Sequence, residues 1–393
     1  MRSRSASWGL MPRVLLFRSE LLPLSETFIA AQAAALTRYE PWFAGLKRIP
    51  GGIALDKEQV IAVSKGDALW DKIVRRAYLR NGFAPAFLNR IEALRPDLIH
   101  AHFATDACAA LPIQQRVWTP LVVTLHGYDV NSDDAALAQL GVGRAYLRHR
   151  RTLRARAQLF LCVSEFIRRR AIEQGFPEQK LWVHPIGIDV DYFRPPASRP
   201  AQPIVLFVGR LTQVKGCTHL IRAMERVQSQ MPEAQLVVAG DGPLRKQLEA
   251  EAAATLRRCI FTGAVTAEGV REWMEQAAVV AVPSDAREGF CLVACEAQAM
   301  QVPVVGFAGP GLSECVANGE SGLLVPQRDA GALADAILTL LRSPSLAGEM
   351  GAAGRERVEW RFNLRRQTAL LELKYDEVLG VTTTAHQPIE AYP

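Results

Sequence analysis

The 393-residue sequence lacks the features that define several protein classes. No uninterrupted apolar run approaches the ~18 residues that a transmembrane helix requires. The seven cysteines are odd in number and scattered, and no two of them stand at the CxxC spacing of zinc or redox sites. No internal repeat or low-complexity segment is present. These absences argue against a membrane-spanning protein, a metal site built from cysteine pairs and a repeat protein. The cysteines are expected to be small packing residues in a reducing compartment.

The charges are distributed unevenly along a chain of ordinary globular composition, with 49% hydrophobic and 22% charged residues. Residues 1–200 contain 28 Lys and Arg against 18 Asp and Glu, whereas residues 201–393 contain 18 against 22. Many of the arginines lie between Arg144 and Arg170, in segments with a helical pattern. A solvated helix face and a surface that meets an anionic membrane explain this pattern equally well. Nucleic acid is not an expected partner, because no binding motif accompanies the arginines.

Short apolar strands alternate with helical segments, a pattern that predicts parallel sheets covered by helices. Arg13–Phe17 and Ile204–Val208 begin two such series, and Ser25 is the N-cap candidate of the first helix. The predicted fold class is α/β, with two doubly wound Rossmann-like domains facing a cleft. The predicted segments are a disordered extension (1–10), a first domain (11–195), a proline-rich linker (196–203), a second domain (204–360) and a frayed tail (381–393).

The segment 283–306 combines the end of a strand, a charged turn and a helix of small residues. Glu288 and Gly289 belong to the turn, and Glu296 belongs to the helix predicted from Leu292 to Met300. This order directs backbone N–H groups and a helix N-terminus toward an anion. An ionised Glu only accepts hydrogen bonds and can hold two hydroxyls at once. The segment therefore indicates a ligand with phosphates and sugars, the alternative being two solvated surface carboxylates.

A second strand-to-helix loop follows Ile204–Val208 and contains Gly209, Arg210 and Lys215. Because both cations come from one loop, they can reach a single diphosphate, Arg with its fork and Lys as a point charge. Taken singly, each of them would be interpreted as a surface charge.

Two further apolar strands are associated with histidines, one of which follows its strand and two of which lie within theirs. His126 comes directly after LVVTL, at the strand end where ligands bind in open α/β sheets. His100 and His102 lie one residue apart and share a strand face, so they could bind a metal. Packing or hydrogen bonding between domains is the better interpretation for this pair.

Three of these motifs together resemble one known family. The pattern GRL-x3-KG at 209–216, the E-x7-E spacing from Glu288 to Glu296 and the HG pair at 126–127 resemble retaining GT-B-type glycosyltransferases, the glycosyl transferases of group 1. The sequence LPLSETFIAAQ (22–32) stands where many relatives have a glycine-rich loop, and this form resembles the exopolysaccharide or colanic-acid-like subset. The usual EGFG motif ends here in Cys291, a departure that could crowd the donor pocket.

The resemblance implies roles for individual residues. Arg210 and Lys215 would neutralise the diphosphate of the donor, Glu288 would hold and orient its sugar, and His126 would contact that sugar. These four are the expected catalytic residues. The expected donor-binding residues, with backbone contacts and the ribose carboxylate, are Gly209, Val265, Gly289, Phe290, Cys291, Leu292 and Glu296. In relatives the last helix, here 361–380, crosses back to the first domain.

The implied function is that of a retaining, metal-independent hexosyltransferase in cell-surface polysaccharide biosynthesis. The donor would be a UDP- or GDP-sugar and the acceptor a lipid-linked glycan or polysaccharide, with no cofactor and no metal, since no DxD-like pair occurs in a suitable loop. The expected location is the cytoplasm, with peripheral attachment of the basic first domain to the inner face of the cell membrane. The alternatives are transfer to a small-molecule acceptor and a non-catalytic, nucleotide-sugar-binding subunit of an assembly complex.

Overall fold

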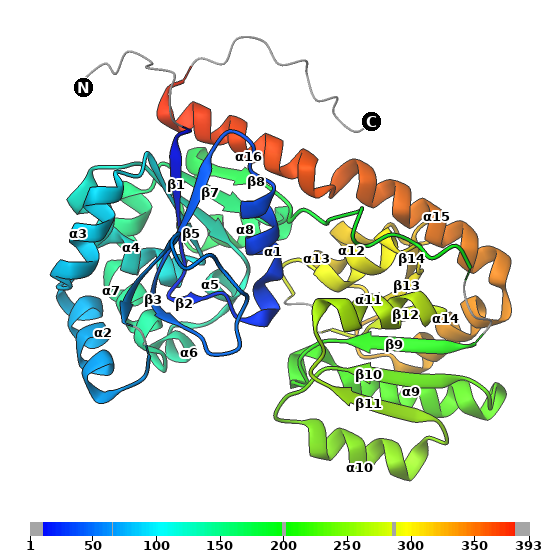
Figure 1. Cartoon of the computed structure of the whole chain (residues 1–393). Coiled ribbons are helices and arrows are strands. Elements are labelled where there is room, and N and C mark those ends of the chain that lie inside the picture. Colours follow the sequence, from blue (N-terminus) through cyan, green and yellow to red (C-terminus); the bar gives the residue numbers. More distant parts are fainter. Residues whose placement is uncertain (1–10, 65, 199–201, 285–287, 382–393) are drawn as a thin grey trace. The chain divides into compact units, whose positions relative to one another are not determined.

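The computed structural model describes residues 11–64, 66–198, 202–284 and 288–381, which form two compact units of alternating strands and helices (Figure 1). The first unit contains the described residues up to Cys162, together with Ile172–Trp182 and the chain from Thr368. The second unit contains Val163–Ala171 and Val183–Gln367. The predicted extension, most of the predicted tail and residues 199–201 of the predicted linker lie outside the described residues. The predicted domain boundaries stay predictions.

The first unit is built on a sheet in the order β2-β3-β1-β5-β6-β7-β8, with β4 also paired to β3. The pairs whose register is resolved are parallel. Its strands are β1 (Arg13–Phe17), β2 (Glu20–Leu21), β3 (Glu40–Arg48), β4 (Val60–Ser64), β5 (Leu98–His102), β6 (Leu121–Leu125), β7 (Leu159–Cys162) and β8 (Leu181–Val183). Its helices are α1 (Thr27–Ala34), α2 (Leu69–Asn81), α3 (Pro85–Leu94), α4 (Ala104–Val117), α5 (Tyr128–Asn131), α6 (Asp134–Ala138) and α7 (Gly141–Arg156).

Two further helices, α8 (Glu165–Glu173) and α16 (Leu364–Leu379), begin in the second unit and end in the first. The central strands β5 and β6 are buried along their whole length, as expected for parallel strands covered on both faces. Leu371 and Tyr375 of α16 are fully buried in the same core as Val14 of β1. The last helix therefore completes the hydrophobic core of the first unit.

The second unit is built on a parallel sheet in the order β11-β10-β9-β12-β13-β14. Its strands are β9 (Ile204–Val208), β10 (Gln235–Ala239), β11 (Cys259–Gly263), β12 (Val279–Val282), β13 (Val304–Phe307) and β14 (Gly322–Val325). Its helices are α9 (Cys217–Gln230), α10 (Arg245–Thr255), α11 (Ala267–Gln276), α12 (Leu292–Ala299), α13 (Pro310–Cys315), α14 (Ala330–Arg342) and α15 (Pro344–Arg361).

The predicted fold class is confirmed, since each unit is an α/β structure with a parallel sheet. The predicted strands Arg13–Phe17 and Ile204–Val208 are β1 and β9. The predicted N-cap at Ser25 is wrong, because Leu24–Glu26 forms a 3-10 turn and α1 begins at Thr27. All seven cysteines are free, and only Cys259 is not fully buried. Within the described residues, no helix is long and apolar enough to cross a membrane.

Strand order changes direction once in each sheet, and ligands of open α/β sheets bind at such a switch, beyond the carboxyl ends of the strands. In the first unit the chain leaves β1 toward β3 and later returns on the other side of β1 with β5. In the second unit it leaves β9 toward β10 and returns on the other side of β9 with β12. A ligand site is therefore expected at the loops after β1 and β5, and another at the loops after β9 and β12.

Candidate functional site

Two residues from separate sequence motifs meet at the switch point of the second unit. Lys215 lies in the loop between β9 and α9, and Glu288 lies in the loop between β12 and α12. The Nζ of Lys215 donates to Oε1 of Glu288 in an ion pair. Because β9 and β12 are neighbours in the sheet, their carboxyl ends bring together side chains that are 73 positions apart in the chain.

Glycine allows these loops to approach one another closely. Gly216, directly after Lys215, has a φ of +67°, and a Cβ there would lie 1.9 Å from the carbonyl oxygen of Pro283. A Cβ on Gly311 of α13 would lie 2.2 Å from the carbonyl oxygen of Glu288. A side chain at Gly216 would push the Lys215 loop away from the segment after β12, and one at Gly311 would push α13 away from the Glu288 loop.

The electrostatics of this pair suit an anionic ligand. Burial acts to lower the pKa of Lys215, but the neighbouring Glu288 carboxylate outweighs it and raises the pKa above its usual value, so Lys215 is protonated. Arg210, exposed at the end of β9, is near enough to oppose this rise as a second cation. The Oε2 of Glu288 is buried and has no hydrogen-bond partner among the residues that the structure describes. The cluster thus offers two cations and one carboxylate oxygen that can accept a hydrogen bond from a ligand.

A second carboxylate, Glu296, lies one turn into α12. Its side chain is partly covered, and burial raises its pKa to about 7. The N-terminus of α12, with Cys291 as its N-cap residue, has no side-chain cap, so its positive end is not satisfied by a side chain of the described chain. Glu296 is a carboxyl in a low-dielectric environment, and hydroxyl donors would stabilise its charged form.

Cys291 fits where relatives are expected to have glycine. Its φ of −104° is an ordinary value for an L-residue, so the backbone there does not demand glycine. The side chain is 3% exposed, and burial raises the pKa of its thiol well above the usual value. Cys291 therefore stays protonated beside Lys215 and Glu288 and acts as a small packing residue.

The other predicted residues of this unit lie at the same edge of the sheet. Gly209 follows β9 and donates its N–H to the carbonyl of Ala239, at 3.0 Å. Val265 follows β11, and Leu292 is the first residue of α12. Gly289 and Phe290 are buried in the turn before that helix. All of them lie near the carboxyl edge of the sheet. The side chains of Lys215 and Glu288 contact each other there directly.

The sequence analysis did not predict a set of hydrogen bonds that holds the turn before α12. Ser164 donates its hydroxyl to the carbonyl oxygen of Gly289 at 2.7 Å, and it accepts the N–H of Ile167 at 3.2 Å. The carboxylate of Glu314, on α13, accepts the N–H groups of Glu165 and Phe166, each at 2.8 Å. Serine before the start of a helix is a recognisable cap signal. Its link to Gly289 is a tertiary contact that no local pattern contains.

His126 lies in the first unit, directly after β6 as predicted. Its ring contacts those of Phe28 and Phe103 at centroid distances of 5.1 and 4.4 Å, and its Nε2 lies 3.1 Å from Nδ1 of His102. Burial, reinforced by the charge of Arg18, lowers the pKa of His126 well below its usual value, so the ring is neutral. Its Nδ1 is buried and has no hydrogen-bond partner among the described residues.

The possible metal ligands His100 and His102 have other partners. His100 is hydrogen-bonded through Nδ1 to the hydroxyl of Tyr375, at 2.6 Å, and through Nε2 to that of Thr124, at 2.7 Å. The rings of His100 and His102 stack at 4.4 Å. Within the described residues no group of three or more His, Cys, Asp and Glu could hold a metal ion. Both ring nitrogens of His100 are thus hydrogen-bonded, and His102 packs against its ring.

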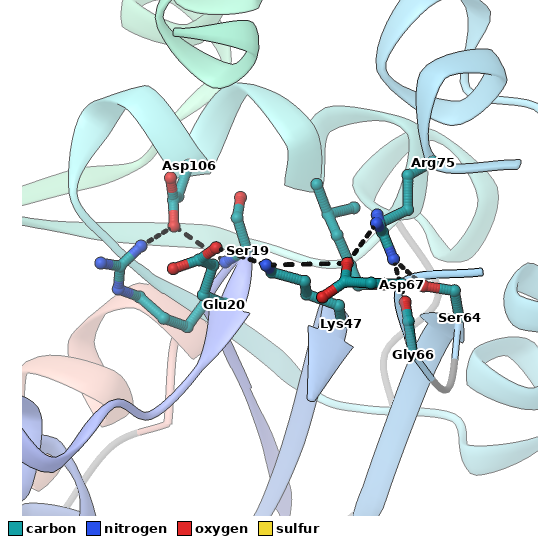
Figure 2. Close-up of polar contacts among 10 residues, drawn as sticks. Ser19, Glu20, Lys47, Ser64, Gly66, Asp67, Arg75 and Asp106 are labelled. Carbon is teal, nitrogen blue, oxygen red and sulfur yellow. Dashed lines mark hydrogen bonds and ion pairs between the residues drawn. The ribbon is translucent and has the colours of Figure 1, made fainter. Parts of the chain in front are cut away.

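The switch point of the first unit carries a buried ion cluster that the sequence analysis did not predict. The guanidinium of Arg18 pairs with Glu26 at 2.6 Å and with Asp106, and it lies 4.3 Å from the centroid of the Phe103 ring. Figure 2 shows Asp106 also accepting the N–H of Ser19, at 2.8 Å. Burial raises the pKa of Glu26. The loop after β1 is thus tied to α4 at the end of β5.

Charged side chains continue along the same edge, as Figure 2 shows. Lys47 of β3 pairs with Glu20 at 3.0 Å, and Arg75 of α2 pairs with Asp67 at 2.7 Å. Arg75 also donates to the hydroxyl of Ser64 at the end of β4, at 2.7 Å. The contacts of Arg75 fix α2 against the end of β4.

Each unit is a parallel α/β structure with polar residues gathered at the carboxyl edge of its sheet, and the two units together have the GT-B fold. Residues 49–192 match the family described as Glycosyltransferase Family 4, and residues 202–343 match the family described as Glycosyl transferases group 1. The chain belongs to this family of glycosyltransferases.

The relatives act on different acceptors according to their names. The D-inositol 3-phosphate glycosyltransferase of Kribbella flavida is 34% identical over 316 residues, which cover 73% of this chain and 74% of that protein. The GDP-mannose-dependent alpha-(1-6)-phosphatidylinositol monomannoside mannosyltransferase of Mycolicibacterium smegmatis is 30% identical, covering 73% and 80%. Escherichia coli WcaL, named for colanic acid biosynthesis, is 29% identical and covers 68% of each chain.

Among solved structures, Anabaena HepE in complex with UDP and glucose has the same fold. The TM-score is 0.72 at 18% sequence identity, over 92% of this chain and 98% of that one. This likeness confirms the fold of the two units.

Proposed function

We propose that the protein transfers a hexose from a nucleotide diphosphate sugar to an acceptor hydroxyl with retention of configuration at the sugar. The observation that carries this proposal is the meeting of Lys215 and Glu288 at the switch point of the second unit, with Arg210 beside them. A cluster of two cations and a carboxylate with one unpartnered oxygen suits a ligand that presents phosphate oxygens and sugar hydroxyls together.

The leaving group is the nucleoside diphosphate. As the bond between sugar C1 and the phosphate oxygen breaks, negative charge grows on that oxygen, and Arg210 and Lys215 stabilise it. Backbone N–H groups of Gly289, Phe290 and Cys291, at the positive end of α12, add to this stabilisation. The acceptor oxygen forms its bond to C1 on the same face, and its proton passes to the leaving phosphate oxygen. The charge on the two side chains makes this reaction independent of a metal.

The carboxylates divide the binding of the donor. When the phosphate takes Lys215 as its partner, Glu288 is released from its ion pair and accepts sugar hydroxyls. Glu296 accepts the two ribose hydroxyls, because it is a partly covered carboxyl on the helix that follows. Gly209, Val265 and Leu292 contact the donor through backbone and packing.

His126 is proposed as a contact of the donor sugar. Its neutral ring and the unpartnered Nδ1 suit a hydrogen bond to a hydroxyl, and its aromatic neighbours fix the ring plane. The acceptor is proposed to be a lipid-linked or polysaccharide glycan, a choice supported by the similarity to WcaL and to the mycobacterial mannosyltransferase. Transfer to a small polyol phosphate is the second candidate, favoured by the 34% identity to the inositol phosphate enzyme.

The first test is a thermal-shift screen of the full chain against UDP-, GDP-, ADP- and TDP-sugars. A ligand that binds only the folded protein raises the melting temperature by mass action, so one nucleotide class should raise it. Glu296→Ala should abolish the shift, and Glu272→Ala, which removes an exposed carboxylate on α11, should leave it unchanged. Absence of a shift with every donor would overturn the donor site.

The second test separates an enzyme from a non-catalytic subunit. With the identified donor and no acceptor, slow release of free sugar should depend on Glu288, because water replaces the acceptor hydroxyl. Glu288→Gln should reduce this release by roughly 100-fold or more, which is the size expected for the loss of one group that stabilises the transition state. Donor binding without release in the wild-type protein would favour the binding subunit.

A further inference from the structure

Asp129 is a buried carboxylate of the first unit that the proposed function does not use. It is the second residue of α5, three positions after His126, and it is 2% exposed. Its Oδ2 accepts the backbone N–H of Ala104 and its Oδ1 accepts that of Gly127, each at 2.9 Å. Both oxygens are therefore directed at the backbone, and these hydrogen bonds offset the cost of burying the charge.

The two hydrogen bonds join the ends of neighbouring strands. β5 and β6 are parallel neighbours, so their carboxyl ends lie at one edge of the sheet. Ala104 directly follows Phe103, and Gly127 directly follows His126. The bond to Gly127 is local, whereas the bond to Ala104 spans 25 positions. The carboxylate of Asp129 thus links the backbone that carries Phe103 to the backbone that carries His126.

The backbone at both places has an uncommon conformation. Phe103 has a φ of +66° and a ψ of +129°, a combination that residues with a side chain rarely adopt. Gly127 has a φ of +121°. Such conformations persist where the surrounding contacts over-determine them. Because Asp129 holds the N–H group that directly follows Phe103, it is one of the contacts that keep this residue in place.

The result is a fixed group of side chains around His126. The rings of Phe103 and His126 lie 4.4 Å apart between centroids, with 36° between their planes. The guanidinium of Arg18 lies 4.3 Å from the same Phe103 centroid, and Arg18 is itself paired with Glu26. The plane of the His126 ring, and with it the direction of its Nδ1, depends on the position of Phe103.

We propose that Asp129 is a positioning residue for the transfer reaction. It ties the end of β5 to the end of β6, holds Phe103 against His126 and thereby fixes the direction of the Nδ1 of His126. Asp129 acts through His126 and is not a catalytic residue, because both of its oxygens face the backbone. This inference rests on the proposed function for the contact between His126 and the donor sugar, whereas the placement of the ring concerns the first unit alone.

Asparagine at this position tests the role at nearly constant size. Burial raises the pKa of Asp129 to about 6, while the backbone N–H groups favour the ionised form, so the carboxylate is mostly ionised at neutral pH and above. The amide of Asp129→Asn accepts through its oxygen only, and its NH2 group faces the N–H of Ala104 or that of Gly127. One of the two strand ends is then released.

A simple capping role is the alternative. Phe103 provides no side-chain cap for α4, and a carboxylate at the first N–H group of a helix is favourable in itself. Loss of such a cap would loosen α4 without an effect specific to His126. Asp133 is the matched control, since it caps α6 by accepting the N–H of Ala136 at 2.7 Å.

The first measurement is NMR of the full chain with isotope-labelled histidine and no ligand. The ring protons of His126 are within the ring current of Phe103, and their signal is identified by its absence in His126→Gln. The signal should move in Asp129→Asn and in Phe103→Leu, and it should keep its place in Asp133→Asn.

His100 reports whether the first unit is folded. Its ring is hydrogen-bonded to Tyr375 and Thr124 of the same unit, so its signal should keep its place in every folded variant. A variant that keeps this signal and moves that of His126 has changed the placement of one ring and not the fold of the unit.

The second measurement is the release of sugar from the donor that the thermal-shift screen identifies. Asp129→Asn should lower kcat by about 10- to 100-fold, because a misplaced contact residue impairs the alignment of the reacting groups. Phe103→Leu keeps the backbone contacts of Asp129 and should lower kcat by about three- to tenfold. The Kd of the free nucleotide should change by less than about twofold in both variants, since its proposed side-chain contacts belong to the second unit. Asp133→Asn should change neither kcat nor Kd.

An unmoved His126 signal in Asp129→Asn would overturn the proposal, and so would an unchanged kcat in a variant whose His126 signal has moved. An equal loss of kcat and nucleotide affinity, or an equal loss in Asp133→Asn, would assign Asp129 to the stability of the unit alone. If Asp129→Asn does not fold, the kcat and the nucleotide affinity of Phe103→Leu decide in the same way. The NMR measurement needs no donor, so a wild-type protein that releases no sugar would overturn the proposed function, and the His126 signal would still decide whether Asp129 places that ring.

Discussion

Glu296 combines two properties that usually exclude one another in a stable protein. Its side chain is partly covered, and burial, rather than a neighbouring charge, raises its pKa to about 7. Most buried carboxylates are paired, because an unpaired charge is costly in a low dielectric. A site that must accept hydroxyls cannot fill this position with a permanent cation. The raised pKa therefore agrees with the proposed role of Glu296 in binding a diol.

Donor binding should depend on pH through this residue. In the proposed complex the ionised carboxylate accepts both ribose hydroxyls, whereas protonation turns one oxygen into a hydrogen-bond donor, so affinity should fall as the pH falls through about 7. The expected loss approaches about tenfold per pH unit below 7. Isothermal titration with a nucleotide sugar between pH 5.5 and 8.5 measures it, since the substituted diphosphate has no ionisation in this range. A flat profile in wild type would contradict the role, and Glu296→Gln should bind weakly at every pH.

The same residue should make the protein less stable than it could be. A Glu in the unfolded chain has a pKa of about 4.3, so the folded state holds the proton more tightly. This extra stability is present at low pH and is lost as the pH rises from about 4.3 to about 7. Glu296→Gln should therefore raise the free energy of unfolding at pH 8 by about 1–3 kcal/mol, and by little at pH 5.

Urea unfolding of wild type and Glu296→Gln at both pH values measures this difference. Glu272→Gln, an exposed change on α11, should show no pH-dependent gain. A variant that is less stable than wild type at pH 8 would mean that the carboxylate has a stabilising partner in the folded protein.

At the scale of elements, the turn before α12 is held by groups from outside its own loop. Ser164 binds the carbonyl of Gly289, the residue after Glu288, and Gly311 lies against the carbonyl of Glu288. The backbone of the turn is therefore fixed on two sides. A small rotation of this turn would move the Glu288 carboxylate relative to the proposed donor sugar while leaving Glu296 in place on the helix.

Ser164→Ala should therefore lower kcat more than it weakens nucleotide binding. The lost hydrogen bond releases the Gly289 carbonyl, so kcat should fall by about tenfold while the Kd for the free nucleotide changes less than about twofold. Ser164→Thr keeps the hydroxyl and should restore most of kcat. Ser229→Ala removes an exposed hydroxyl bonded to the carbonyl of Arg226 and serves as the control. An equal loss of kcat and nucleotide affinity would indicate general loosening of the unit instead.

The sequence predicted the elements of the site better than the contacts between them. Apolar runs bounded by glycine and polar residues are local signals, and they located β1, β9 and the helix that begins at Leu292. The meeting of Lys215 and Glu288 could be anticipated, because neighbouring parallel strands end at one edge. The resemblance to a family added the roles, which no spacing alone defines.

The contacts that were missed join residues far apart in the chain. Ser164 and Gly289 are 125 positions apart, and Arg18 and Asp106 are 88 apart. Ser25 failed as an N-cap because Glu26 is drawn into the pair with Arg18, and Leu24–Glu26 forms a 3-10 turn instead of the first helical turn. A tertiary ion pair overrode a local capping preference, which local sequence patterns cannot reveal.

At the scale of the whole molecule, the end of the chain completes the unit formed by its beginning. Glu372 of α16 accepts the N–H groups of Thr37 and Arg38, each at 2.7 Å, across 335 and 334 positions. Leu371 and Tyr375 are fully buried in the first core. The first unit thus cannot finish folding until the last helix has been made, whereas the described sheet of the second unit is complete by β14.

A chain that ends at Gln367 should lose the first unit and keep the second. Each large buried side chain removed costs about 3–5 kcal/mol, and two of them approach the whole stability of a typical domain. Hydrogen exchange should become fast in β5 and β6 and stay slow in β9 and β12. The nucleotide that the donor screen identifies should still protect the loops that contain Lys215 and Glu288. Glu377→Ala, an exposed change on the same helix, should alter neither unit. Slow exchange in β5 and β6 of the shortened chain would mean that the first core is stable without α16. Loss of protection by the nucleotide would mean that the proposed donor site needs the first unit.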